Sequence, residues 1–452
     1  MSDPTVIPVL DEGLGNSSYL VDLGDGRALA VDPSRDLRAL RSTAERRGLT
    51  VAFAADTHLH ADFLTGAVQL SATDGARILV SAAGERDYGH HALRDGDEVD
   101  VGGLRLRALA TPGHTDEHVS FLLLDGEHPI GVFTGGSLIV DSAARTDLNG
   151  DHRADELARA QYASLHQLMT LPDDVNVWPT HGAGSFCSAP PGADRMSTIG
   201  RERTSNPLLQ LPDEDAFVAA LLGSLGSYPP YFGHLGEINR RGPALLTAPL
   251  RLEPMAVERV ARLRDDAAMI VDARRITAYA AGHIPGSLSI ELRDAFATWL
   301  GWLVPFDTAP IVIRDADQDP AEIAWQAAKI GYTLAGELDG GMTAWTAARL
   351  PTTTTRLVTP TDIDGMHVLD IRQRPEYASA HVPGARHIEL GALAADASTV
   401  DDEATVLMCG HGERAMSAAS LIEHAGGATV AVLVGGPDDW STTHSQALET
   451  SL

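Results

Sequence analysis

Cysteine is nearly absent from the chain, which has only Cys187 and Cys409 among its 452 residues. Two cysteines make no disulfide framework, and the sequence has no Cys-x-x-Cys pair that could hold structural zinc. Such sparse use of cysteine is typical of proteins from a reducing compartment. The sequence therefore excludes a disulfide-stapled secreted scaffold and directs attention to each cysteine individually.

Basic residues are also scarce, since 34 Lys and Arg face 62 Asp and Glu, for a formal net charge of −28. Nucleic acids and anionic membrane surfaces attract basic patches, so we expect neither as a partner. The acidic excess keeps a protein soluble but names no ligand. We read it as a solvated surface.

No apolar run reaches the roughly 20 residues needed to span a bilayer. The first ten residues lack the positive start and the apolar stretch of a signal peptide, so we expect a cytoplasmic location. Hydrophobic residues make up 44% of the chain and charged residues 21%, as in ordinary globular proteins. A chain of 452 residues is expected to form two to four domains.

The first 200 residues alternate short apolar runs with stretches of helical periodicity. Six runs have the length and composition of strands: 50–55, 77–80, 104–109, 119–124, 131–133 and 175–178. The stretches 34–48 and 155–170 carry the apolar spacing of helices. This mixture predicts sheets covered by helices. For the Gly-, Pro- and Arg-rich region 190–252 we expect an extended connector with at least one helix, 213–225.

The C-terminal part contains an internal repeat. Three elements occur twice in the same order: Val271-Asp272-Ala273-Arg274 and Leu369-Asp370-Ile371-Arg372, Gly282-His283-Ile284-Pro285-Gly286 and Ala380-His381-Val382-Pro383-Gly384, and Gly340-Gly341-Met342-Thr343-Ala344-Trp345 and Gly435-Gly436-Pro437-Asp438-Asp439-Trp440. The second copies lie 98, 98 and 95 residues after the first. Two copies of one domain explain this order directly. The strand, turn and helix pattern of each copy predicts a parallel α/β sheet.

Cys409 lies where a predicted strand runs into a predicted helix. The strand over 405–408 leads into the loop Cys409-Gly410-His411-Gly412-Glu413-Arg414, and a helical segment follows over 416–424. Backbone N–H groups at such a turn, with the helix dipole, stabilise a thiolate. Glycines let the backbone curl around the sulfur, and Arg414 can hold an anionic sulfur oxyacid by paired hydrogen bonds. The loop therefore predicts a reactive thiolate.

Two other interpretations of this loop are weaker. Most free cysteines are buried and inert, but the strand-end position, the glycines and the arginine together favour a reactive one. Protein phosphatases use a similar cradle, yet their loop has one more residue between cysteine and arginine than the four here. The smaller ring suits a sulfur atom better than a phosphate.

The elements Asp-x-Arg, His-x-Pro-Gly, Cys-x-x-Gly-x-Arg and Gly-Gly-x-x-x-Trp resemble the rhodanese family of sulfurtransferases. The resemblance covers two α/β domains, over about 253–352 and 353–452. It implies that Cys409 carries a sulfane sulfur as a persulfide, with Arg414 as its catalytic partner. The cradle implied around the sulfur is the loop Gly410, His411, Gly412 and Glu413. Thiosulfate, sulfite and a low-molecular-weight thiol persulfide are the implied partners.

The first copy departs from that pattern because it has no cysteine. Its strand over 311–313 leads into Arg314-Asp315-Ala316-Asp317-Gln318-Asp319, and either Arg314 or Asp315 occupies the nucleophile position, depending on a one-residue gap. A loop rich in carboxylates would also repel an anionic sulfur donor. We therefore expect a structural repeat, kept for packing or for docking other domains.

Histidines gather at the ends of predicted strands in the first 200 residues. The motifs are His58-Leu59-His60-Ala61-Asp62, Pro112-Gly113-His114-Thr115 and Pro179-Thr180-His181-Gly182. Two histidines and an aspartate in one strand-end loop can converge on a cation, and a histidine from a later loop can complete the set. The motifs predict a metal site on His58, His60 and His114, with Asp62 and His181 as further candidates.

The same motifs resemble the metallo-β-lactamase superfamily, in particular its glyoxalase II and persulfide dioxygenase branch. The resemblance covers about 1–200 and implies an αββα sandwich, so we expect a first domain over 1–252, connector included. This domain followed by two rhodanese repeats resembles the bacterial persulfide dioxygenase–sulfurtransferases. That resemblance implies Fe(II) held by two histidines and one carboxylate, with Zn as the alternative cation.

Two positions depart from the family pattern. Gly136 stands where the family has a metal-ligating aspartate, and Phe63 where it has a further histidine. Loss of that carboxylate removes charge compensation for a divalent cation, so we expect low metal occupancy. Three interpretations stay open: a site rebuilt on three histidines, rescue by a carboxylate such as Asp62 or Asp141, and a domain without metal.

These features predict a persulfide dioxygenase-like sulfurtransferase of sulfide or persulfide metabolism, with sulfane sulfur carried on Cys409. One alternative is a metal-free metallo-β-lactamase scaffold that supports the rhodanese, and another is a metal-dependent thioester hydrolase. The sequence does not identify the thiol that carries the persulfide or the acceptor of the sulfur. It also leaves open the oligomeric state, with a homo-oligomer as one possibility.

Overall fold

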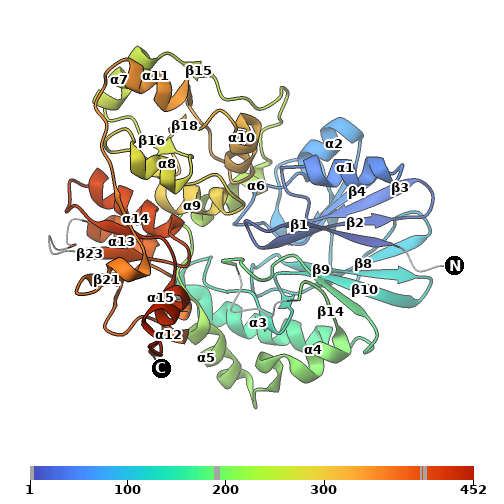
Figure 1. The fold of residues 1–452 in the computed structure, drawn as a ribbon. Coiled ribbons are helices and arrows are strands. Elements are labelled where there is room, and N and C mark those ends of the chain that lie inside the picture. Colours follow the sequence, from blue (N-terminus) through green and yellow to red (C-terminus); the bar gives the residue numbers. More distant parts are fainter. Residues whose placement is uncertain (1–4, 188–193, 398–399, 401–404, 452) are drawn as a thin grey trace. The chain divides into compact units, whose positions relative to one another are not determined.

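The structure, a computed structural model, describes residues 5–187, 194–397, 400 and 405–451 (Figure 1). The chain divides into two units. The N-terminal unit comprises Met1–Pro249 with Ala328–Gly331, and the C-terminal unit comprises Leu250–Ala327 and Tyr332–Leu452.

Two six-stranded sheets form the N-terminal unit. The first has the order β1-β2-β3-β4-β5-β6, with β1 (Val6–Asp11), β2 (Asn16–Asp22), β3 (Arg27–Val31), β4 (Thr50–Asp56), β5 (Arg77–Ser81) and β6 (His91–Leu93). The second has the order β14-β13-β10-β9-β8-β7, with β7 (Glu98–Asp100), β8 (Leu104–Ala110), β9 (Val119–Asp125), β10 (His128–Gly135), β13 (Asn176–Pro179) and β14 (Ser197–Thr198). Buried side chains of both sheets, including Tyr19, Phe53, Phe121 and Phe133, pack in one layer between them.

Helices cover the outer faces of these sheets. Leu40 of α1 (Arg38–Arg46) and Leu70 of α2 (Ala67–Asp74) pack on the first sheet, whereas α3 (Ala154–Leu168), α4 (Ile199–Ser205) and α5 (Glu214–Ser224) contribute to the core on the second. The unit also holds α6 (Phe232–Arg241), the hairpin β11 (Leu138–Ile139) and β12 (Ser142–Ala143), and the short 3-10 turns η1 (Ala82–Gly84), η2 (Asp151–Arg153) and η3 (Pro207–Gln210). These four layers confirm the predicted αββα sandwich.

The C-terminal unit contains the two predicted α/β repeats, each built on a five-stranded sheet. The first sheet has the order β15-β19-β18-β16-β17 and the second β20-β24-β23-β21-β22, all paired in parallel. The first repeat contains β15 (Pro254–Met255), α7 (Val257–Asp265), β16 (Ile270–Asp272), α8 (Ile276–Ala281), β17 (Leu288–Ser289), α9 (Phe296–Leu303), β18 (Ile311–Ile313), α10 (Pro320–Lys329), β19 (Gly336–Leu338) and α11 (Gly341–Ala347). The second contains β20 (Arg356–Val358), η4 (Pro360–Asp362), β21 (His367–Asp370), α12 (Arg374–Ser379), β22 (Arg386–His387), α13 (Leu390–Asp396), β23 (Thr405–Met408), α14 (Glu413–His424), β24 (Ala431–Leu433) and α15 (Pro437–His444).

The strands predicted from apolar runs in the N-terminal unit are confirmed as β4, β5, β8, β9, β10 and β13, with ends displaced by at most three residues. In the region 190–252 the predicted helix over 213–225 is confirmed as α5, but the described part is less extended than expected because it also forms α4 and α6. No helix in the described ranges is long and apolar enough to cross a membrane.

Candidate functional site

Cys409 is the first residue after β23, and its loop ends where α14 begins at Glu413. The amide of Gly412 donates a hydrogen bond to Cys409 Sγ, with an N–S distance of 3.1 Å. Gly412 has a φ of 117°, and a Cβ there would lie 3.0 Å from Ile276 Cδ1 and 3.3 Å from the carbonyl oxygen of Leu433. Only glycine therefore fits this turn, which aims a backbone donor at a sulfur that is buried.

We expect Gly412→Ala to lower the free energy of unfolding by about 1–3 kcal/mol, because alanine would be strained at this φ. Gly410→Ala is the matched control. Its Cβ would lie 3.7 Å from the nearest atom outside its neighbours, on Arg414, so a change within about 0.5 kcal/mol is expected. Denaturant unfolding of both variants checks the pair, and equal losses would contradict the assigned role of Gly412.

The guanidinium of Arg414 is paired with a carboxylate. Its two terminal nitrogens donate to the Glu376 oxygens at 2.6 and 2.8 Å. Burial alone would raise the pKa of Glu376, but these hydrogen bonds outweigh it and leave that pKa lowered. Arg414 Cζ also lies 5.9 Å from the ring centroid of Trp299 in the first repeat. Glu376 neutralises Arg414, so the loop does not present the free positive charge expected from the sequence. The catalytic role of Arg414 stays a prediction.

In each repeat the Asp-x-Arg element ties the end of a strand to the backbone of a residue eight positions after the arginine. Asp370 accepts from Arg372 Nε and Nη2, and Arg372 Nη2 also donates to the carbonyl oxygen of Ala380 at 2.7 Å. Asp272 and Arg274 make the same bonds in the first repeat. Since both pairs are buried and bond to backbone, we read this motif as structural.

Strand register identifies the first-repeat equivalent of Cys409. Ile313 pairs with Asp272 as Met408 pairs with Asp370, so the residue after each strand corresponds. Arg314 is therefore the equivalent, which decides between the two residues that the sequence left open. Its guanidinium donates to Glu337 and to carbonyl oxygens of its own loop.

The first repeat packs against the helix that follows the cysteine loop. The Ser417 hydroxyl of α14 donates to the carbonyl oxygen of Ser289 at 2.6 Å, and the Ser289 amide donates to Ser420 Oγ at 3.0 Å. These bonds join β17 of the first repeat to α14 of the second. They support the structural role predicted for the repeat that lacks cysteine.

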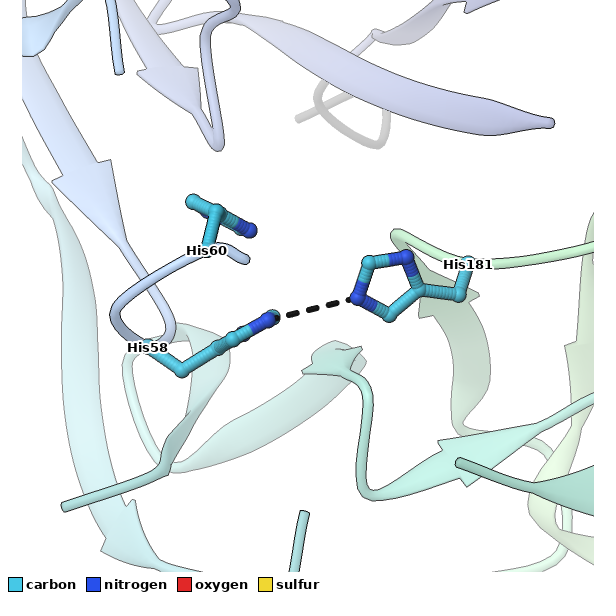
Figure 2. A group of neighbouring side chains, drawn as sticks. All are labelled: His58, His60 and His181. Atoms are coloured by element: carbon cyan, nitrogen blue, oxygen red, sulfur yellow. Dashed lines mark hydrogen bonds between the residues drawn. The ribbon is translucent and has the colours of Figure 1, made fainter. Parts of the chain in front are cut away.

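Four imidazoles converge in the N-terminal unit at strand ends. His58 and His60 follow β4 and His181 follows β13, and Figure 2 shows His58 and His181 pointing toward each other with His60 beside them. The His114 ring lies 4.7 Å from that of His58 and 5.3 Å from that of His181, between centroids. All four are buried. The structure thus brings together the histidines predicted as metal ligands.

Hydrogen bonds fix the protons of His114 and His181. His114 Nδ1 donates to the carbonyl oxygen of Arg145 at 2.7 Å, and His181 Nδ1 donates to Asn16 Oδ1 at 3.0 Å. Burial lowers the pKa of both imidazoles to about 3, so each is neutral and carries one proton. Nε2 of both rings therefore presents a lone pair. That of His114 is buried, with no hydrogen-bond partner among the described residues.

Asp32 organises the other two histidines. Its carboxylate accepts from the Thr57 amide at 2.7 Å and from the Thr57 hydroxyl at 2.8 Å. The hydroxyl oxygen of Thr57 consequently accepts from His58 Nδ1, 2.9 Å away. His58 Nε2 therefore presents a lone pair. His60 Nε2 donates to Asp32 at 3.1 Å, and although burial lowers the pKa of His60, the charge and hydrogen bond of Asp32 outweigh it and leave that pKa raised. A carboxylate behind a histidine orients the ring and increases its basicity as a metal ligand.

The spacing of these lone pairs fits a metal ion. His58 Nε2 and His181 Nε2 lie 3.3 Å apart, and neither has a proton for the other (Figure 2). Two nitrogens at about 2.0–2.1 Å from a tetrahedral ion lie about 3.3 Å apart. Ligand atoms of His58, His60 and His181 all lie within 4.8 Å of one another. The residues present therefore fit a divalent cation.

Known proteins match both units. The rhodanese-like domain family matches residues 256–348 and 353–443, one match in each repeat. The human mitochondrial persulfide dioxygenase ETHE1 is 32% identical over 221 residues, which are 47% of this chain and 78% of that protein. A metallo-beta-lactamase structure from Staphylococcus aureus subsp. aureus COL is 31% identical, with a TM-score of 0.64 over 74% of this chain and 98% of its own. The chain belongs to the metallo-β-lactamase/rhodanese fusion proteins.

A hydrolase is also similar to the fusion protein. The hydroxyacylglutathione hydrolase of Methylococcus capsulatus is 32% identical over 182 residues, which are 39% of this chain and 64% of that protein.

Gly136 and Phe63, the two positions that depart from the pattern implied by the resemblance, both lie against the histidine cluster. A Cβ at Gly136 would lie 2.3 Å from His114 Cδ2, so the His114 ring occupies the space where a side chain would begin. Phe63 is buried and stacks on His60, with centroids 4.1 Å apart. Asp141 accepts from a serine hydroxyl of α4 instead of joining the cluster. The carboxylate beside the histidines is Asp62, whose Oδ2 accepts from Asn16 and whose buried Oδ1 has no partner among the described residues.

The connector supplies residues that the sequence patterns missed. Asn239 of α6 donates to the carbonyl oxygens of His60 at 2.8 Å and of Phe63 at 2.9 Å. The Tyr231 hydroxyl donates to the carbonyl oxygen of Asp62 at 2.9 Å. These bonds hold the His-x-His-x-Asp loop. The one available signal was that Asn239 follows a leucine by four residues and so shares the apolar face of its helix.

Proposed function

We propose that the fusion protein is a persulfide dioxygenase-like sulfurtransferase of sulfide or persulfide metabolism, with sulfane sulfur carried on Cys409. The observation that carries this proposal is the Gly412 amide donating to Cys409 Sγ in a strand-to-helix loop. A thiolate there is stabilised by that donor and by the start of α14. The similarity to persulfide dioxygenases and to rhodanese-like domains supports the same chemistry.

In the proposed transfer the Cys409 thiolate attacks the outer sulfur of thiosulfate. The new S–S bond forms as the S–S bond of thiosulfate breaks, so Cys409 becomes a persulfide anion and sulfite leaves with the bonding electron pair. A thiol then takes the outer sulfur, giving a thiol persulfide and restoring the thiolate. The Glu376–Arg414 pair positions the loop during both steps.

In the N-terminal unit the proposed ligands are His58, His60 and His114, with Asp62 and His181 beside them. Bound Fe(II) would supply oxygen activation for the oxidation of a low-molecular-weight thiol persulfide to sulfite. The chain's own part is to hold the imidazole rings in place, since Asp32 orients His60 and burial keeps the cluster away from water. We assign this activity to a domain over 1–252, and sulfur transfer to the domain over 353–452, with 253–352 as its structural partner.

Incubation with thiosulfate is expected to add one sulfur atom to the peptide that contains Cys409, measured by mass spectrometry. Cys187 serves as an internal control, because it is buried in the other unit and burial raises the pKa of its thiol well above the usual value. Sulfur found on Cys187 alone would refute the assignment of the carrier.

A further inference from the structure

Gly136 contributes no side chain to the histidine cluster, whereas the thiol of Cys187 lies beside two of its imidazoles. Its side chain is fully buried. The Sγ of Cys187 and ligand nitrogens of His114 and His181 all lie within 4.8 Å of one another. His181 also belongs to the set formed with His58 and His60, so the thiol lies at the edge of the same cluster.

The backbone of one residue ties Cys187 to His114. The Arg145 amide donates to the carbonyl oxygen of Cys187 at 3.0 Å, and the carbonyl oxygen of Arg145 accepts from His114 Nδ1 at 2.7 Å. The Cys187 amide in turn donates to Ser185 Oγ at 3.2 Å. These hydrogen bonds fix the position of Cys187 relative to the His114 ring. Neither Cys187 Sγ nor His114 Nε2 takes part in them.

Ring nitrogens of His114 and His181 give independent evidence for a bound ligand. His114 Nε2 is a buried lone pair with no partner among the described residues, and His181 Nε2 is a second lone pair fixed by Asn16. A buried acceptor without a donor costs free energy unless a cation or a proton donor reaches it. The His114 ring fills the space beside Gly136, and a ligand nitrogen of this ring lies within 4.8 Å of Cys187 Sγ.

We propose that Cys187 is a metal ligand, and that it binds the cation together with His114 and His181. On binding, the S–H bond breaks, the sulfur electron pair forms the bond to the metal, and the proton is released to the solvent. The thiolate supplies the negative charge that Gly136 cannot. A soft sulfur with two imidazoles favours zinc or another late transition metal over magnesium or calcium.

The inference concerns the metal site of the proposed function but is tested without sulfur transfer. In Cys409→Ser protein Cys187 is the sole cysteine. Titration of this full-length protein with Co²⁺ is expected to give a near-ultraviolet thiolate-to-cobalt charge-transfer band. Adding Cys187→Ser should abolish the band and weaken cobalt binding at least about 10-fold.

X-ray absorption of the zinc-loaded Cys409→Ser protein keeps the test decisive if the double variant fails to fold, because a sulfur scatterer is expected at about 2.3 Å. Cobalt bound without the band, zinc bound without the sulfur scatterer, or no cation bound at all would overturn the proposal. None of these results touches the activity of Cys409, which is measured separately on the native chain. Conversely, failure of Cys409 to take up sulfur would leave the band unaffected.

Discussion

Cys409→Ser protein is expected to lose sulfur transfer from thiosulfate by at least about 1,000-fold, because the thiolate is the nucleophile and serine has no comparable anion at neutral pH. The side chain is buried beside one backbone donor, and the substitution changes a single atom. Folding should therefore be preserved while the reaction is lost. Release of sulfite in the presence of a thiol acceptor measures the loss.

The matched control is Arg314→Ser, at the equivalent position of the first repeat. Arg314 is engaged by Glu337 and by its own loop, so its removal is expected to leave most of the turnover as long as the unit stays folded. Thermal unfolding of the control checks that condition. A folded Arg314→Ser protein as inactive as the Cys409 variant would show that the first repeat takes part in transfer.

The sequence predicted the positions of the candidate reactive residues, but not which charged side chains pair with them. The strand end before Cys409 and the His-x-His-x-Asp loop follow from short-range periodicity and turn residues, and both lie where they were predicted. The partner of Arg414 did not follow, because Glu376 is 38 residues away in sequence and on another helix. A pattern read along the chain has no access to such a pairing.

The candidate metal site shows the same limit. That His58, His60 and His114 converge could be predicted from spacing, but which nitrogen of each ring is free depends on distant partners. Asp32 determines the proton of His60 across 28 residues, and the carbonyl of Arg145 determines that of His114. Gly136 could be read from the sequence only as a lost ligand, whereas the structure shows the His114 ring in its place.

The residue of the first repeat that is equivalent to Cys409 could be identified only from strand pairing. Arg314 and Asp315 are both plausible neighbours of a short strand, and no motif in that copy separates them. Pairing of Ile313 with Asp272 separates them at once, since the equivalent pair in the second repeat ends directly before Cys409.

The second large effect is expected from the Asp-x-Arg motif. Asp370→Ala should lower the free energy of unfolding of the C-terminal unit by about 3–5 kcal/mol, because it leaves the Arg372 guanidinium buried without its carboxylate. The side chain of Asp370 is 0% exposed and that of Arg372 is 9% exposed, so water cannot replace the lost partner. Asp272→Ala in the first repeat should have a loss of the same size, since its pair with Arg274 is equally buried.

Tryptophan fluorescence during denaturant unfolding measures this loss selectively, because five of the six tryptophans lie in the C-terminal unit. Asp265→Ala is the matched control, since the side chain of Asp265 is exposed at the end of α7 and loss of its pair with Arg264 should change the free energy of unfolding by less than about 1 kcal/mol. A loss below about 1 kcal/mol for Asp370→Ala as well would mean that the buried pair does not hold the fold. The motif would then have to be explained by the reaction at Cys409, whose strand β23 pairs with the strand that ends in Asp370.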